Sequence, residues 1–247
     1  DQYKPGYQNI LLALESPAMV DHHGWLDPGM QFDAEISFKN YYKLQNYHCC
    51  RTLYVNNDNF VEMETLEESQ KRRLVSMIYS RLDYLPGHIL RHKVAADWGG
   101  KVDLFGAGTG RFLRDKRESL SPYCFQIVIE NGKYPEYVSE KLYDCIKTHT
   151  IPVYWGGETA LKKMGFDTEA MLFFDNIGDL DALFSDKINT DFYHGVLEGA
   201  RYNRQRLIEL RNESRMEVYY HAYYHRYIHT VDSYLGLKKS RYNYRLQ

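Results

Sequence analysis

Residues 124–155, CFQIVIENGKYPEYVSEKLYDCIKTHTIPVYWG, contain two β-favouring segments with a helix-forming segment between them. The first segment, 125–129, is mostly apolar, as expected of a strand that is covered on both faces. Ser139 can cap a helix that runs to about residue 149, and residues 151–155 form the second β-favouring segment. A strand, a helix and a second strand in this order predict a βαβ unit with a parallel crossover.

Polar residues occupy the turn after the first strand and the start of the helix. Glu130 and Asn131 come directly after the strand, and in an open parallel sheet ligands bind beyond the carboxyl ends of the strands. The free N–H groups at the start of the helix favour an anion. Lys141 lies in the first helical turn, where a cation opposes the helix dipole. We therefore expect an anionic ligand, rather than folding, to explain this lysine.

Two neighbouring side chains extend this interpretation to a nucleotide. The carboxylate of Glu140 can accept hydrogen bonds from the vicinal hydroxyls of a ribose, and Tyr137 supplies one more donor. Together with Lys141 they predict a nucleotide diphosphate as the ligand. The alternative is a Rossmann-like βαβ unit whose helix merely begins with charged residues.

The same segment closely resembles the donor motif of the α1,3/α1,4-fucosyltransferases, glycosyltransferase family 10. That family carries F-x-x-x-F-E-N, then Y-x-T-E-K, then V/I-P-V/I-Y-W/x-G, with the same spacing. In this chain Ser139 replaces the usual Thr, and Ile129 replaces the usual aromatic residue. An upstream segment that ends in Glu15-Ser16-Pro17 resembles the family's E-S-P strand end. The resemblance spans residues 10–174.

This resemblance implies an inverting transfer of L-fucose from GDP-fucose to a hydroxyl of a glycan acceptor that contains N-acetylglucosamine, through an α1,3 link. It implies that Glu15 is the general base near the acceptor oxygen. Arg91 and Lys141 are then expected to stabilise the charge that develops on the departing diphosphate. The alternative for Glu15 is a strand-end carboxylate that pairs with a nearby lysine.

The resemblance also assigns the remaining donor contacts. Glu130 and Asn131 are expected to face the fucose and the phosphates. Tyr137 is expected to contact a phosphate, and Glu140 the ribose.

The domain organisation follows from the resemblance as well. We expect an α/β, GT-B-like fold with a Rossmann-type parallel-sheet donor domain and a truncated or abbreviated N-terminal acceptor domain. Residues 1–70 are expected to be the end of the acceptor-side domain, and residues 71–195 the GDP-sugar domain. Residues 196–247 are expected to form helices that pack back on the domains. The chain is then either a fragment or a short form that another chain completes.

No cofactor and no metal ion are predicted. The segment 175–181, DNIGDLD, indicates a strand end, a turn and a helix cap rather than a cation site. His221, His225 and His229 are spaced along one side of a predicted helix, among five tyrosines. This pattern is typical of a packed or membrane-facing helix, so the tyrosine-rich helix is the expected site of a membrane-surface or oligomer contact.

Composition limits the classes of function. The chain has 247 residues, 44% hydrophobic and 26% charged, and a net charge of −2, which indicates a globular protein and excludes general nucleic-acid binding. Its cysteines lack the close-spaced pairs of secreted family members; they are Cys49, Cys50, Cys124 and Cys145. We therefore expect a cytoplasmic protein of bacterial or viral type, or a Golgi lumenal one if an N-terminal anchor has been removed.

Two alternative functions stay open at this stage. The first is a transferase of the same architecture that uses another GDP-sugar, such as a mannosyl donor. The second is a non-catalytic subunit that binds GDP or a sugar.

Overall fold

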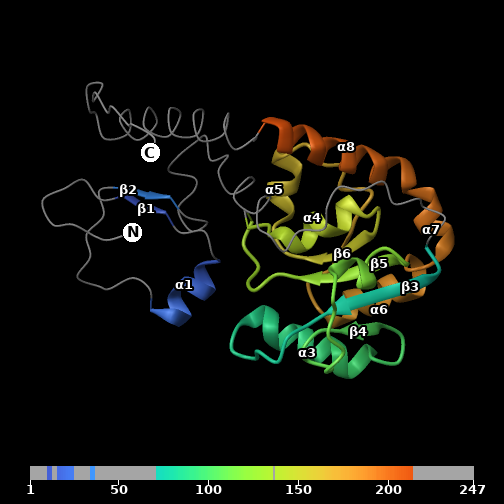
Figure 1. The fold of residues 1–247 in the computed structure, drawn as a ribbon, viewed down its shortest axis with the longest axis horizontal. Helices are drawn as coiled ribbons and strands as arrows, with labels where there is room; N and C mark the ends of the chain where they lie inside the picture. The colour runs from blue at the N-terminus through green and yellow to red at the C-terminus, as the bar shows by residue number, and fades with distance from the viewer. Residues whose placement is uncertain (1–9, 13–15, 25–33, 37–70, 136, 214–247) are drawn as a thin grey trace, which may run out of the picture.

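The computed structural model describes residues 10–12, 16–24, 34–36, 71–135 and 137–213 (Figure 1). The main body is a five-stranded sheet of order β4-β3-β5-β6-β7, and every neighbouring pair is parallel. This confirms the predicted parallel α/β class. The strands are β3 (Arg73–Ile78), β4 (Asp103–Phe105), β5 (Tyr123–Ile129), β6 (Ile151–Trp155) and β7 (Leu172–Phe173).

Helices cover both faces of this sheet, with α4, α5 and α8 on one side and α3 and α6 on the other (Figure 1). A short 3-10 helix, η4, precedes β5, and α7 connects α6 to α8. The bounds are α3 (Pro86–Trp98), η4 (Lys116–Ser119), α4 (Glu140–Lys147), α5 (Glu158–Lys163), α6 (Ile177–Asp186), α7 (Thr190–Gly195) and α8 (Leu197–Glu213).

The central strand β5 is buried along its whole length, as its apolar sequence predicts. Phe125 and Ile127 belong to the core cluster on the α3 side, whereas Val128 belongs to the cluster on the α4 side. Full burial of each such side chain contributes about 1.5–3 kcal/mol. The carboxyl end of β5 therefore has a firmly held position.

Helix α4 confirms the predicted βαβ unit. The Ser139 hydroxyl accepts a hydrogen bond from the backbone N–H of Lys141 and caps the helix start. The helix is slightly shorter than expected, because Thr148 closes it through hydrogen bonds to Cys145 and Ile146 carbonyls. His149 then has a positive φ of 51°. A right-handed helix requires negative φ angles, so the helix cannot include this residue.

The segment around residues 175–181 has the structure that its sequence predicts. Asn176 and Asp179 form a reciprocal capping box at the start of α6. Asp179 accepts hydrogen bonds from the backbone N–H groups of Asp175 and Asn176 at 2.9 and 3.1 Å. These carboxylate and amide groups are used to begin a helix.

Both cysteines of the described residues are free and buried, as expected of small core residues; they are Cys124 and Cys145. Burial raises the pKa of the Cys145 thiol, so it stays protonated. Cys49 and Cys50 lie outside the described residues.

A small N-terminal part accompanies the main body. Strand β1 (Ile10–Leu12) pairs in parallel with β2 (Ala34–Ile36), and helix α1 (Pro17–His23) lies between them in sequence. Ser16 is buried and its Oγ accepts from the backbone N–H of Met19, which caps α1.

Several predictions fall outside the described residues. They concern Glu15, most of residues 1–70, and the tyrosine- and histidine-rich segment after residue 213. The predicted domain boundaries therefore stay predictions. Among the helices of the described residues, none is both long enough and apolar enough to cross a bilayer.

Candidate functional site at the carboxyl edge of the sheet

Glu130 follows β5 directly and is completely buried. Its carboxylate accepts hydrogen bonds from the backbone N–H and the hydroxyl of Ser139, at 2.8 and 2.7 Å. The Tyr154 hydroxyl from β6 donates a third at 3.1 Å. A buried carboxylate needs such donors to offset the loss of hydration. Glu130 thus joins the end of β5, the end of β6 and the start of α4.

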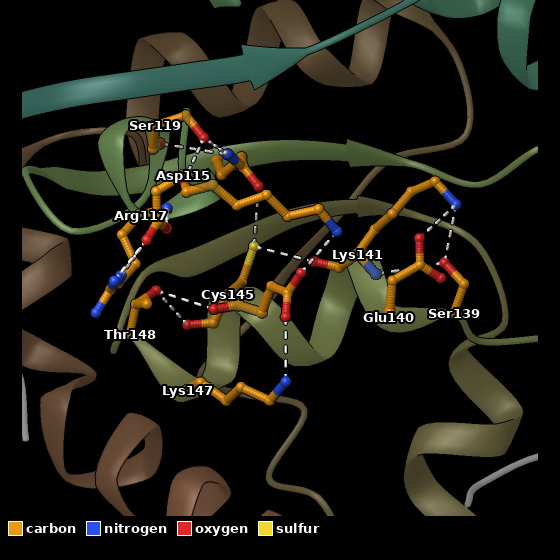
Figure 2. Close-up of polar contacts among 12 residues, drawn as sticks. Asp115, Arg117, Ser119, Ser139, Glu140, Lys141, Cys145, Lys147 and Thr148 are labelled. Atoms are coloured by element: carbon orange, nitrogen blue, oxygen red, sulfur yellow. Dashed lines mark hydrogen bonds and ion pairs between the residues drawn. The ribbon is translucent and has the colours of Figure 1, made fainter. Parts of the chain in front are cut away.

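Lys141 extends from the first turn of α4 toward the same carboxylate. Its Nζ lies 3.3 Å from Glu130 Oε2, 3.0 Å from Ser139 Oγ and 3.8 Å from Glu140 Oε1. Figure 2 shows Lys141 beside Ser139 and Glu140 at one end of α4. The expectation that folding does not explain this cation is therefore wrong, because two carboxylates pair with it. Its side chain is still 31% exposed.

Arg91 approaches the site from α3 and holds the turn after β5. Its Nε and Nη2 donate to the Ile129 carbonyl at 3.0 and 2.6 Å, and Nη2 donates to Asn131 Oδ1 at 2.8 Å. Arg91 is only 7% exposed. Burial lowers its pKa, and the nearby Glu130 opposes this change. Arg91 therefore lies beside Asn131, and its contact with a donor diphosphate stays a prediction.

Glu140 and Tyr137 complete the set of predicted residues, and they differ in accessibility. The Glu140 side chain is 24% exposed, whereas Tyr137 is only 1% exposed. Burial raises the pKa of Glu140, but Lys141 and Lys116 outweigh it and leave that pKa below its usual value. Glu140 is therefore ionised, and part of its side chain is exposed.

All six predicted donor-side residues lie around the carboxyl end of β5. Lys141 and Glu140 have partly exposed side chains that a ligand could contact, whereas Asn131 is only 9% exposed. Glu130 and Tyr137 are buried in this structure. The contacts predicted for each residue with fucose, phosphate or ribose stay predictions.

Two residues of this edge were missed by sequence reasoning. His88 lies one turn before Arg91 on α3, and the Asn131 side chain is among the groups that influence its pKa. Its i, i+3 spacing from Arg91 is the signal that could have found it. Lys116 pairs with Asp144 of α4 at 3.0 Å and lies near Glu140. Nothing in the local sequence of Lys116 indicates this placement.

The start of α3 sits directly against the end of β5. The Gly87 N–H donates to the Asn131 carbonyl at 3.1 Å. A Cβ on Gly87 would lie 1.7 Å from the Glu130 carbonyl oxygen, so only glycine allows this approach. The N-termini of α3 and α4 consequently converge on the turn at Glu130 and Asn131.

Metal-ligating side chains do not gather here. Within the described ranges, no group of three His, Cys, Asp or Glu side chains could hold a metal ion. Metal-independent activity stays a prediction.

The fold and this edge define a class of protein: a parallel α/β sheet with two helix N-termini and several cations at the carboxyl ends of its strands, the arrangement that binds nucleotides. Residues 68–181 match the family model described as glycosyltransferase family 10 (fucosyltransferase), C-terminal part. The chain resembles the fucosyltransferases of that family.

Individual relatives are similar to this chain over limited regions. A 53-residue segment is 42% identical to the alpha-(1,3)-fucosyltransferase FucT of Helicobacter pylori, and covers 22% of this chain and 11% of that protein. A crystal structure of an alpha1,3-fucosyltransferase with GDP-fucose aligns with a TM-score of 0.44 and 25% identity, over 53% of this chain and 40% of that one. Another, with GDP, aligns with a TM-score of 0.43 and 18% identity, over 76% and 57%. The chain thus spans less than two thirds of each of these relatives.

Proposed function

We propose that this chain carries the donor site of an inverting fucosyltransferase. The reaction is the transfer of L-fucose from GDP-fucose to a hydroxyl of an N-acetylglucosamine-containing glycan, through an α1,3 link. The observation that carries this proposal is the convergence of Arg91, Asn131, Glu140 and Lys141 at one strand end, within the segment that matches the family model.

The cations at this edge have hydrogen-bonding capacity left for a diphosphate. An ammonium group has three donors, and Lys141 directs two of them at Glu130 and Ser139. The guanidinium of Arg91 uses Nε and Nη2 for Ile129 and Asn131, which leaves Nη1 for a phosphate oxygen. Both side chains are held in place before any ligand arrives, so little reorganisation accompanies binding.

The same groups serve the chemical step. In a single in-line displacement, the bond between the sugar and the diphosphate breaks while the acceptor oxygen attacks the sugar carbon from the opposite side. Negative charge then develops on the departing GDP. Lys141, Arg91 and the N–H groups at the start of α4 stabilise that charge where it forms. Glu130 and Ser139 hold Lys141 in this position.

The acceptor hydroxyl must lose a proton during the attack. We assign this to Glu15, whose carboxylate takes the proton as general base. Ser16, the next residue, is buried and caps α1.

A binding and turnover experiment tests the proposal. Calorimetry of the wild-type chain with GDP, GDP-fucose and GDP-mannose is followed by a transfer assay with GDP-fucose and N-acetyllactosamine. We expect GDP-fucose to bind more tightly than GDP-mannose and fucose transfer to persist in EDTA. Tighter binding of GDP-mannose would favour another donor, and GDP binding without turnover would favour a non-catalytic subunit. Absence of both binding and turnover would overturn the proposal.

Two substitutions separate the assigned roles. Lys141→Ala should weaken GDP binding about 10–100-fold, because a charged hydrogen bond to phosphate is lost, and transfer should fall with it. Glu15→Ala should reduce transfer at least about 100-fold while GDP affinity changes less than about twofold. The control is Lys162→Ala, which removes an exposed lysine of α5. Equal loss of GDP binding in the Lys141 and Glu15 variants would contradict this division.

A further inference from the structure

A row of aromatic rings connects the N-terminal part of the chain to the donor edge. The ring of Tyr84, in the loop between β3 and α3, stacks on His22 of α1 with centroids 4.0 Å apart and planes 13° apart. Tyr84 also meets His88 of α3 edge to face, with centroids 4.8 Å apart and planes 87° apart. His22 and His23 are themselves in contact, at 5.2 Å. Aromatic pairs of this kind contribute more to stability than burial of their apolar area alone would.

The row continues through His88 into the residues of the donor edge. His88 is 2% exposed, and its contact with the Asn131 side chain opposes the lowering of its pKa, as expected when the ring N–H donates to that side chain. Asn131 Oδ1 also accepts from Arg91, so two side chains of α3 meet at the same oxygen. Within the described residues His88 Nδ1 has no partner, so the bond to Asn131 is made by Nε2. Contacts thus run without a break from α1 to Arg91.

The ring can make this contact in its neutral form, with its one proton on Nε2 and Nδ1 unprotonated. Burial, followed by the charges of Arg91 and Lys141, lowers the pKa of His88 to about 4. The ring is therefore neutral at physiological pH, and its charge state suits the contact with Asn131.

We propose that Tyr84 and His88 are positioning residues that couple binding of a nucleoside diphosphate at Arg91 and Asn131 to the docking of helix α1. The donor role of Arg91 and Asn131 is that of the proposed function, on which this inference rests. Helix α1 begins two residues after Glu15, the assigned base. An occupied donor site consequently stabilises the docked position of α1, and a docked α1 strengthens donor binding by the same factor.

Hydrogen exchange of the α1 amides tests the docking contact without any ligand. In Tyr84→Leu we expect faster exchange in α1 than in the wild type, because the stacked ring of His22 loses its partner. Tyr84→Phe keeps the ring and should restore wild-type exchange. The matched control is Tyr79→Leu, which breaks a similar edge-to-face pair with His92 at 5.3 Å on the same helix α3. Unchanged α1 exchange in Tyr84→Leu would overturn the proposal whatever the protein binds.

Titration with GDP then tests the coupling. GDP should slow exchange of α1 in the wild type but not in Tyr84→Leu or His88→Phe. Both variants should bind GDP about 3–10-fold more weakly, the effect expected of one lost ring contact or one lost hydrogen bond. Tyr84→Phe should bind GDP as the wild type does, and Tyr79→Leu should leave the GDP-dependent protection of α1 intact.

The outcomes separate this inference from the proposed function. If the wild type binds GDP and transfers fucose but GDP does not change the hydrogen-exchange rate of the α1 amides, the coupling is wrong and the proposed function stands. If the wild type does not bind GDP, the proposed function fails, and the coupling to a nucleotide fails with it. Loss of GDP-dependent protection in Tyr79→Leu as well would also overturn the specific role of Tyr84.

Discussion

The two edges of the parallel sheet each contain a lysine, and the two lysines have opposite environments. At the carboxyl edge, Lys141 pairs with Glu130 and Glu140 and stays 31% exposed. At the amino edge, Lys71 precedes β3 and donates to the Leu120 carbonyl and the Thr150 hydroxyl, at 3.1 and 2.7 Å. One cation has charged partners, and the other has neutral oxygens.

This difference changes what each lysine can do. Burial lowers the pKa of Lys71 to about 7, and its neutral partners do not compensate for the lost hydration. Lys141 has carboxylates beside it, and part of its side chain lies open to solvent. A strongly shifted pKa therefore marks the amino edge, whereas the features of an anion site belong to the carboxyl edge. Burial of a charge alone is a poor guide to function in this sheet.

The largest expected effect lies at the carboxyl edge. Glu130→Gln should lower the free energy of unfolding by about 2–3 kcal/mol, because it removes a buried charge that pairs with Lys141 and accepts from Ser139. Urea denaturation measures the change. Glu158→Gln is the matched control, since it removes an exposed carboxylate paired with Lys162, and it should cost less than about 0.5 kcal/mol. Equal losses in the two variants would remove the distinction between a buried and a surface pair.

A smaller effect of opposite sign is expected at the amino edge. Lys71→Met should raise the free energy of unfolding at pH 6 by about 1–2 kcal/mol, because the desolvated ammonium is replaced by an apolar chain. Thr150 still donates to the Leu120 carbonyl at 2.9 Å, so that carbonyl keeps a partner.

The pH dependence of this gain has a definite sign. The folded-state pKa of Lys71 is about 7 and lies below the usual 10.5, so the unfolded chain binds more protons between these values. Wild-type stability therefore rises with pH in this window, and the advantage of Lys71→Met should shrink from pH 7 toward pH 10. Lys93→Met, on the exposed surface of α3, should change stability by less than about 0.5 kcal/mol at either pH. A gain that does not vary with pH would contradict the assigned cause.

The smallest effect concerns another pair at the amino edge. The Tyr123 hydroxyl donates to Asp103 at 2.8 Å, and burial, together with Asp103, raises the pKa of Tyr123 to about 12. Tyr123→Phe should cost about 0.5–1 kcal/mol in urea denaturation at pH 7, the worth of one hydrogen bond. Tyr202→Phe, whose hydroxyl donates to the Gly165 carbonyl at an exposed site, should cost less. The reverse order would show that burial does not set the strength of these bonds.

The central βαβ unit could be predicted from sequence because its signals are local. An apolar run, a breaking Asn-Gly pair and the capping Ser139 lie within some twenty residues, and the strands and α4 follow them closely. The end of α4 was placed two residues too far, because the positive φ of His149 is not visible in residue type. A histidine is uncommon in that conformation, and glycine is the usual signal.

The site was predicted in outline but not in its contacts. Glu130, Asn131, Glu140 and Lys141 are close in sequence, so one turn brings them together. Their hydrogen-bond partners could not be predicted from local sequence patterns. The Tyr154 hydroxyl, 24 residues away, reaches Glu130 only because β5 and β6 are neighbouring strands. The interior orientation of Glu130 follows from that contact.

Residue types and their spacing alone determined the parallel strands, the capped helix and the place where anions are expected, since each depends on backbone preferences over a few neighbouring residues. Only the tertiary structure decided which charges are paired, which are exposed, and that Tyr84 and His88 join α1 to Asn131. Packing brings together groups that are distant along the chain, and the energy of a charge depends on those neighbours and on its access to water.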